Sequence, residues 1–350
     1  MSDKKIALIT DQHFGVRKNS EVFLKSHMRF FKEQFIPYLK ENNITTIAML
    51  GDLFDNRTHI STKIHSHVFN LFENELREFE IYVLVGNHDI YYNSKIDVHS
   101  LHFLSKFENV KLIDESQTVQ IYDRNVVMVP WLIDQKKIHQ VVKENEGDVM
   151  FGHFDIRGFY FNKYKVSDEG ISAETFSNKF KKVFSGHFHT RSTRSVGDTE
   201  FVYVGSPYQT TRNDIDEERG FIVLDMETLD YEFVNNDVSL KYIKLQFPQR
   251  FTKEMIQNNI IDIHIKYDDS YKEAKIEKYL NRIESFNPIV RPSTFILNDD
   301  TMDSDFDLSD CNISSITNLM RDYVDSLEID NKEKVYKILI EFYNKTKGDY

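Results

Sequence analysis

Five short segments of the chain carry side chains that bind metal ions and transfer protons. They are Asp11-Gln12-His13, Gly51-Asp52, Gly86-Asn87-His88-Asp89, Gly152-His153 and Gly186-His187-Phe188-His189. Each segment alone is compatible with an ordinary turn, because Gly and Asn are frequent in turns. Together, Asp, Asn and His form a mixed oxygen and nitrogen ligand set, which suits Mn²⁺, Fe or Zn²⁺ better than a thiolate site would. Five such segments in one chain predict a metal centre.

A short run of β-forming residues directly precedes each of these segments. The runs are Ile6 to Thr10, Ile47 to Leu50, Ile81 to Val85, Val149 to Phe151 and Val183 to Ser185. Open α/β sheets place their sites just beyond the carboxyl ends of their strands. The metal ligands are therefore expected at one edge of such a sheet.

The first 150 residues alternate strand and helix signals. Amphipathic helices are predicted over Glu21 to Lys40 and Thr62 to Phe79, between strands over Ile6 to Thr10, Thr46 to Leu50 and Ile81 to Val85. This βαβαβ rhythm predicts an α/β fold. Further strands are expected at 118–122 and 125–129, and strands predominate from 149 to 233.

The remaining chain divides into three further parts. Residues 240–297 read as strand, helix, strand and helix, at 241–246, 252–258, 260–267 and 271–283. Between Asp299 and Asp310 there are six Asp and no Lys or Arg, which predicts a solvated linker. Two amphipathic helices follow. The predicted domains are 1–239, 240–297, a linker at 298–312 and a helical tail at 313–350.

Composition and charge narrow the class of protein. The chain has 350 residues, 40% of them hydrophobic, which is enough for one large domain with additions. The lone Cys311 fits a reducing compartment, and no signal peptide or apolar run of membrane-spanning length is seen. A cytoplasmic protein is expected. The net charge of −12 argues only weakly against nucleic acid, because a metal centre is itself a strong local positive charge.

The order and residue types of the five segments resemble those of the calcineurin-type metallophosphoesterases, whose pattern is D-x-H, G-D, G-N-H-D, G-H and G-H-x-H. Within them, the chain is most similar to the SbcD-type DNA repair nucleases, including the small nuclease subunits of T-even phage recombination endonucleases. The finer match lies in Gly51-Asp52-Leu53-Phe54-Asp55, Val129-Pro130-Trp131, Gly158-Phe159-Tyr160-Phe161 and Tyr203-Val204-Gly205-Ser206-Pro207. The resemblance covers about the first 225 residues well.

This resemblance implies a four-layer α/β/β/α sandwich with a small α+β capping domain and C-terminal helices. It also implies two divalent metal ions, Mn²⁺ in the first place and Mg²⁺ as the alternative, bridged by Asp52. The ligands of one ion would be Asp11, His13 and His189, and those of the other Asn87, His153 and His187. His88 would donate to the phosphate or protonate the leaving oxygen, and Asp55 could orient a ligand or His88.

Three functions compete. The resemblance favours a DNA nuclease subunit, exonuclease or endonuclease, that works with an SbcC-type ATPase in double-strand-break processing and recombination. Alternatives are hydrolysis of small phosphomonoesters or cyclic nucleotides, and a non-catalytic scaffold of the same fold. DNA, the ATPase and a second copy of the chain are the expected partners, and the tail at 313–350 is the predicted ATPase-binding segment. The predicted helices Glu21 to Lys40 and Thr62 to Phe79 are candidates for the homodimer contact.

Overall fold

The computed structural model describes residues 4–92, 94–145, 147–162, 165–177, 179–266, 273–287 and 293–297, and in the tail 321, 324, 332–333, 335–337 and 340. The chain divides into two compact units, Met1–Ile265 with Asp269–Phe295, and Lys266–Asp268 with Ile296–Tyr350. The predicted linker lies outside the described residues, as does nearly all of the predicted tail. Among the described helices, none has the length and apolar character needed to cross a membrane.

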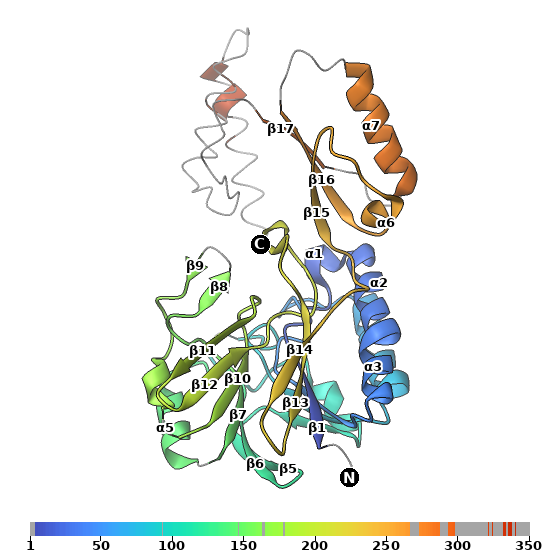
Figure 1. Cartoon of the computed structure of the whole chain (residues 1–350). Helices are drawn as coiled ribbons and strands as arrows, with labels where there is room; N and C mark the ends of the chain where they lie inside the picture. The colour runs from blue at the N-terminus through green and yellow to red at the C-terminus, as the bar shows by residue number, and fades with distance from the viewer. Residues whose placement is uncertain are drawn as a thin grey trace. The chain divides into compact units, whose positions relative to one another are not determined.

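Two six-stranded sheets form the body of the first unit (Figure 1). The first sheet has the order β14-β13-β1-β2-β3-β4, in which β1 to β4 run parallel, β13 is antiparallel to β1, and β14 is antiparallel to β13. Its strands are β1 (Lys5–Ile9), β2 (Thr46–Met49), β3 (Glu80–Leu84), β4 (Val110–Ile113), β13 (Gly220–Asp225) and β14 (Tyr231–Asn235).

The second sheet has the order β11-β12-β10-β7-β6-β5. Strands β6, β7, β10 and β12 are parallel, while β5 and β11 are antiparallel edge strands. Its strands are β5 (Gln117–Ile121), β6 (Arg124–Val129), β7 (Val149–His153), β10 (Lys182–Gly186), β11 (Ser192–Val196) and β12 (Thr199–Tyr203).

Alternation along the strands explains how the layers stack. Side chains of Ile6 and Leu8 in β1 join the core shared with Phe151 and Phe184 of the second sheet. Their neighbours Ala7 and Ile9 point the other way and join the core under the helices. Successive residues of a strand face opposite sides of the sheet, so a strand buried on both faces reads as a continuous apolar run.

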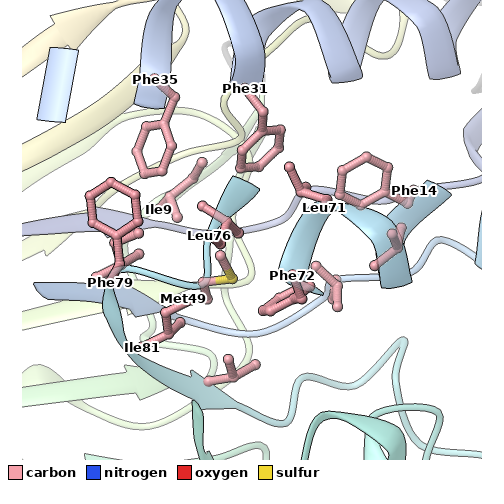
Figure 2. Close-up of a cluster of buried hydrophobic side chains, with 14 of the residues drawn as sticks. Ile9, Phe14, Phe31, Phe35, Met49, Leu71, Phe72, Leu76, Phe79 and Ile81 are labelled. Carbon is pink, nitrogen blue, oxygen red and sulfur yellow. The ribbon is translucent and has the colours of Figure 1, made fainter. Parts of the chain in front are cut away.

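Helices cover the outer face of each sheet. The helices α2 (Glu21–Phe30), α3 (Ile36–Glu41) and α4 (Thr62–Asn70) cover the first sheet. Figure 2 shows Phe31 and Phe35 packed over Ile9 and Met49. On the second sheet, Ile138 and Val142 of α5 (Lys137–Glu144) pack against the outward side chains of β6 and β7. The predicted four-layer α/β/β/α sandwich is confirmed.

Several predicted element boundaries are corrected. The helix predicted over Glu21 to Lys40 is interrupted by a π-helical turn at Phe31–Phe35, and the helix predicted to reach Phe79 ends with a π turn at Leu71–Glu75. The predicted helix at 252–258 is only α6 (Lys253–Ile256). The sequence does not predict β4, α5, β11 or the short pair β8 (Tyr160–Asn162) and β9 (Lys165–Val166). Strand β11 reads as polar because it is a partly exposed edge strand that gains order by pairing with β12.

The region predicted as a capping domain has a sheet and core of its own. Strands β15 (Tyr242–Gln246), β16 (Ile260–Lys266) and β17 (Ser293–Leu297) form a sheet that packs with α6 and α7 (Glu273–Phe286). Its core includes Leu245, Ile256, Ile263 and Ile283. Most of it belongs to the same compact unit as the sandwich, and an ion pair from Arg212 to Asp262 joins the two. The boundary at 239/240 stays a prediction.

Candidate metal centre

The five ligand segments meet where strands of two different sheets end. The expectation that all the ligands lie at the edge of one sheet is therefore corrected. Asp11 and His13 follow β1, Asp52 follows β2, and Asn87 follows β3 in the first sheet. The other histidines come from the second sheet: His153 is the last residue of β7, and His187 and His189 follow β10. Strands β7 and β10 are paired in register, with His153 opposite Gly186. The packing of the sheets therefore brings distant segments together.

The backbone at these strand ends adopts conformations that few residues tolerate. Asp11, His13, Asp52 and His187 have φ angles of 52°, 43°, 54° and 92°. Positive φ is uncommon for residues other than glycine and clusters at functional sites, where the surrounding structure must hold it. At Gly86 a β-carbon would overlap the Asp52 carboxylate, which is why the G-N-H-D segment begins with glycine.

Asn87, His153 and His187 form one ligand cluster. Asn87 Oδ1 lies 3.0 Å from His153 Nε2 and 2.9 Å from His187 Nδ1. The Leu50 carbonyl oxygen is 2.6 Å from His153 Nδ1 and can only accept, so Nδ1 carries the hydrogen. In the neutral ring, Nε2 is then a bare acceptor facing another acceptor. Such a contact requires a cation, either a proton on Nε2 or a metal ion bound by both atoms, and the 3.0 Å spacing is that of neighbouring ligands on an ion bound at about 2.0–2.2 Å.

A second cluster forms around His13. Its Nε2 lies 3.0 Å from His189 Nε2 and 3.8 Å from Asp11 Oδ1, and His189 Nε2 is 3.7 Å from the same oxygen. The Asp11 carboxylate also accepts a hydrogen bond from the backbone N–H of His187, which ties the two clusters together. Burial, aided by the neighbouring His189, holds the pKa of His13 well below its ordinary value. The ring is therefore neutral, as a metal ligand must be.

Asp52 lies between the two clusters. Its Oδ2 is 3.4 Å from His153 Nε2 and 3.8 Å from His13 Nε2, while its Oδ1 accepts from the backbone N–H of His88 at 2.8 Å. Burial alone would raise the pKa of this carboxyl group, but His153, His13 and His88 together outweigh burial and lower the pKa. Asp52 is consequently ionised, buried and within reach of both clusters.

His153 shows how strongly the centre attracts a cation. Burial by itself lowers the pKa of His153. The nearby Asp52 carboxylate acts in the opposite direction, and the resulting pKa is about 9. A proton on this ring therefore balances the centre when no metal ion does. Binding of a metal ion has to displace that proton. The residues present, with carboxylate and amide oxygens and imidazole nitrogens, fit a pair of divalent ions.

His88 and Asp55 lie beside the clusters, and Asp55 meets His88 through its backbone and the ligand His13 through its carboxylate. His88 Nδ1 is 2.6 Å from the backbone carbonyl oxygen of Asp55, not from its side chain. The Asp55 carboxylate instead lies 3.6 Å from His13 Nδ1, and burial raises its pKa. Both residues line a cavity of about 530 Å³ together with His13, Arg17 and His189. The cavity therefore opens onto His88 and onto the cluster around His13.

Asp89, which the sequence analysis does not assign, holds two ligand loops together. Its Oδ2 accepts from the backbone N–H groups of Asp52 and Gly86 at 3.0 and 2.9 Å, and its Oδ1 accepts from Phe54 at 3.3 Å. The side chain is fully buried, and burial raises its pKa to about 7. The feature of the sequence that could have identified Asp89 is its position as the last residue of the G-N-H-D segment. Asp155 and Trp131, both against His187, were also missed.

Comparison with known proteins agrees with this geometry. The sequence profile of the calcineurin-like phosphoesterases matches residues 4–191, a range that contains every predicted ligand. The chain belongs to the calcineurin-like phosphoesterases. It is therefore a hydrolase of phosphate ester bonds, and its family uses divalent metal ions.

Relatives of this phosphoesterase include components of nucleases. It is 27% identical over 344 residues to exonuclease subunit 1 of Enterobacteria phage T4, covering 97% of each chain. The SbcD component of the SbcCD nuclease of Staphylococcus epidermidis is 22% identical over 254 residues, covering 64% of this chain and 66% of that protein. An archaeal phosphodiesterase structure aligns with a TM-score of 0.37 at 16% identity, covering 66% of this chain and 99% of its own. The resemblance to SbcD-type and phage nucleases is confirmed.

Proposed function

We propose that this phosphoesterase is a Mn²⁺-dependent DNA nuclease that hydrolyses phosphodiester bonds at a pair of metal ions, with Mg²⁺ as the alternative. The observation that carries the proposal is the position of Asp52 Oδ2 between two ligand clusters. The cluster around His13 lines a cavity that His88 also lines. The names of two relatives, both of which describe parts of nucleases, support a nucleic acid as the substrate, and DNA is the nucleic acid we propose.

Each predicted ligand has a place in this scheme. Asp52 would bridge the ions, with Asp11, His13 and His189 on one side and Asn87, His153 and His187 on the other. Two divalent ions, when bound, activate a water molecule for in-line attack on phosphorus and stabilise charge on the phosphoryl oxygens. Because every predicted ligand is present and gathered, a non-catalytic scaffold has no support.

His88 has the geometry of a proton donor. Its Nδ1 is held by the Asp55 carbonyl oxygen, which can only accept, so Nδ1 carries a hydrogen. Nε2 remains as the nitrogen that can hold a proton and give it to the substrate. We assign His88 to the leaving oxygen or to a phosphoryl oxygen. Asp55 positions His88 through its backbone and faces His13 with its carboxylate.

Exposed aromatic side chains that follow two of the ligand segments along the chain support a nucleic-acid substrate. Tyr91 and Tyr92, which follow the G-N-H-D segment, are 46% and 41% exposed, and Tyr160 is 49% exposed. Lys95 lies over the Tyr92 ring at 4.8 Å. Arg17 lines the cavity itself. Basic and aromatic groups of this kind hold phosphates and stack on unpaired bases, despite the negative net charge of the chain.

Hydrolysis assays with four substrates test the proposed function. We expect the purified full chain to degrade linear duplex or single-stranded DNA and a small phosphodiester with Mn²⁺, more slowly with Mg²⁺, and not with a chelator present. A phosphomonoester serves as the comparison substrate. If the phosphomonoester is hydrolysed while DNA remains intact, the alternative function of a small-molecule phosphatase is favoured. If DNA and the small phosphodiester both remain intact under every metal condition, the proposal of a nuclease is refuted.

The partners are part of the same proposal. The name of one relative describes it as one component of a larger nuclease, which supports an SbcC-type ATPase partner for this chain. Removal of the predicted tail at 313–350 should abolish co-purification with that ATPase and leave hydrolysis of a small phosphodiester unchanged. Retention of the ATPase by the shortened chain would contradict the tail assignment. The homodimer stays a prediction. The two helices that are candidates for its contact, α2 and α4, carry an ion pair between Lys63 and Glu21 within the chain.

A further inference from the structure

The ring of His187 has partners at both nitrogens and on one face. Nδ1 lies 2.9 Å from Asn87 Oδ1, inside the ligand cluster. On the opposite side of the ring, Nε2 lies 2.8 Å from Asp155 Oδ1. The Trp131 ring packs against the imidazole with centroids 5.0 Å apart and an interplanar angle of 37°.

The backbone of Asp155 is fixed by the fold. Its carbonyl oxygen accepts from the N–H of Ile171 at 3.0 Å. On either side of it, the buried Tyr203 hydroxyl donates to the Phe154 carbonyl oxygen and accepts from the Ile156 N–H, at 2.8 and 2.9 Å. A side chain at Gly170, whose φ is +92°, would overlap the Asp155 backbone and β-carbon. The Asp155 carboxylate is thus presented to His187 by a braced turn beyond β7.

This contact determines which nitrogen of His187 is free. A carboxylate oxygen only accepts hydrogen bonds, so the hydrogen of the neutral ring is placed on Nε2. Nδ1 is left as a bare acceptor within the ligand cluster. Without the carboxylate, the ring could carry its hydrogen on Nδ1 and donate it to Asn87 Oδ1, which would occupy two ligand atoms at once.

The other histidines show that this is a special arrangement. The hydrogen on His153 Nδ1 is held by a main-chain carbonyl, that of Leu50, which no side-chain substitution removes. His13 Nδ1 is buried without a hydrogen-bond partner among the described residues. In His187, by contrast, the group that holds the ring hydrogen is a side chain, the carboxylate of Asp155.

We propose that Asp155 is a positioning residue of the metal centre, which holds His187 in the tautomer and orientation that turn Nδ1 toward the Asn87 side of the site. The proposal rests on the proposed two-ion function. Groups that orient a histidine ligand in this way typically contribute about 10- to 100-fold to metal affinity. The effect should be confined to the ion held by Asn87, His153 and His187.

The test compares Asp155→Ala and Asp155→Asn with wild type. Asp168→Asn is the matched control, because Asp168 is an exposed carboxylate near Gly170. Calorimetric titration of the metal-free full chain with Mn²⁺ should show two ions in wild type and in the control. In Asp155→Ala the affinity for one ion should fall about 10- to 100-fold while the other stays unchanged. Asp155→Asn, which preserves shape but can also donate to Nε2, should show a loss in the same direction.

A second readout does not depend on metal or activity. In ¹⁵N-histidine NMR spectra of the metal-free proteins, with the His187 signals assigned through His187→Gln, the ring hydrogen should lie on Nε2 in wild type and leave it in Asp155→Ala. Two ions bound to Asp155→Ala at wild-type affinity, or a hydrogen that stays on Nε2, would overturn the proposal for Asp155 and leave the two-ion function standing. Wild type that binds no ion would overturn both.

Discussion

Replacement of Asp52 by alanine should remove both metal ions from the protein. Its Oδ2 lies between His153 Nε2 and His13 Nε2, at 3.4 and 3.8 Å, so one carboxylate belongs to both ligand clusters. We expect phosphodiester hydrolysis to fall by more than about 10³-fold, because loss of even one well-placed electrostatic contact to a transition state costs about 10²–10³. Metal analysis of the purified variant by mass spectrometry measures the loss directly.

A variant of an exposed carboxylate separates the loss of metal from a general loss of structure. Asp230→Ala removes an exposed carboxylate and should keep both ions and full activity. Circular dichroism should show that Asp52→Ala retains its secondary structure, because the strands around it are held by extensive apolar packing. If Asp52→Ala binds two ions with wild-type affinity, Asp52 is not the bridge.

Much of the site could be predicted because its residues lie in short segments at strand ends. Apolar runs such as Ile6 to Thr10 identify a strand buried on both faces, and the polar segment after each run identifies its end. The ligand atoms of Asp11, Asp52 and Asn87 then have to gather, because parallel strands of one sheet end at one edge. The fold class follows from the same alternation of elements.

What the sequence could not show depends on contacts between distant segments. The meeting of Asp155 with His187 requires the parallel register of β7 and β10, which nothing local specifies. The contribution of two sheets rather than one depends on their face-to-face packing. The contact from His88 to Asp55 uses a backbone carbonyl, and sequence patterns describe side chains. Helix α5 was missed although Ile138 and Val142 are spaced for one helical face, because the segment is short and otherwise polar.

Replacement of His88 by glutamine should separate the chemistry from metal binding. The contact of His88 with Asp52 is made by the backbone N–H, which the substitution preserves. The glutamine amide can still donate to the Asp55 carbonyl oxygen, but it cannot transfer a proton. We therefore expect both ions to remain bound while the rate of DNA hydrolysis falls about 10²–10⁴-fold, the usual contribution of a positioned acid or base.

The leaving group of the substrate reveals which oxygen His88 serves. If His88 protonates the leaving oxygen, a diester with a nitrophenolate leaving group needs little help, and His88→Gln should hydrolyse it at nearly the wild-type rate. If His88 instead donates to a phosphoryl oxygen, DNA and the activated diester should lose rate equally. His67→Gln, an exposed substitution of the same kind on α4, should change neither. Loss of a metal ion from His88→Gln would make His88 a ligand, because only then does its side chain hold the centre together.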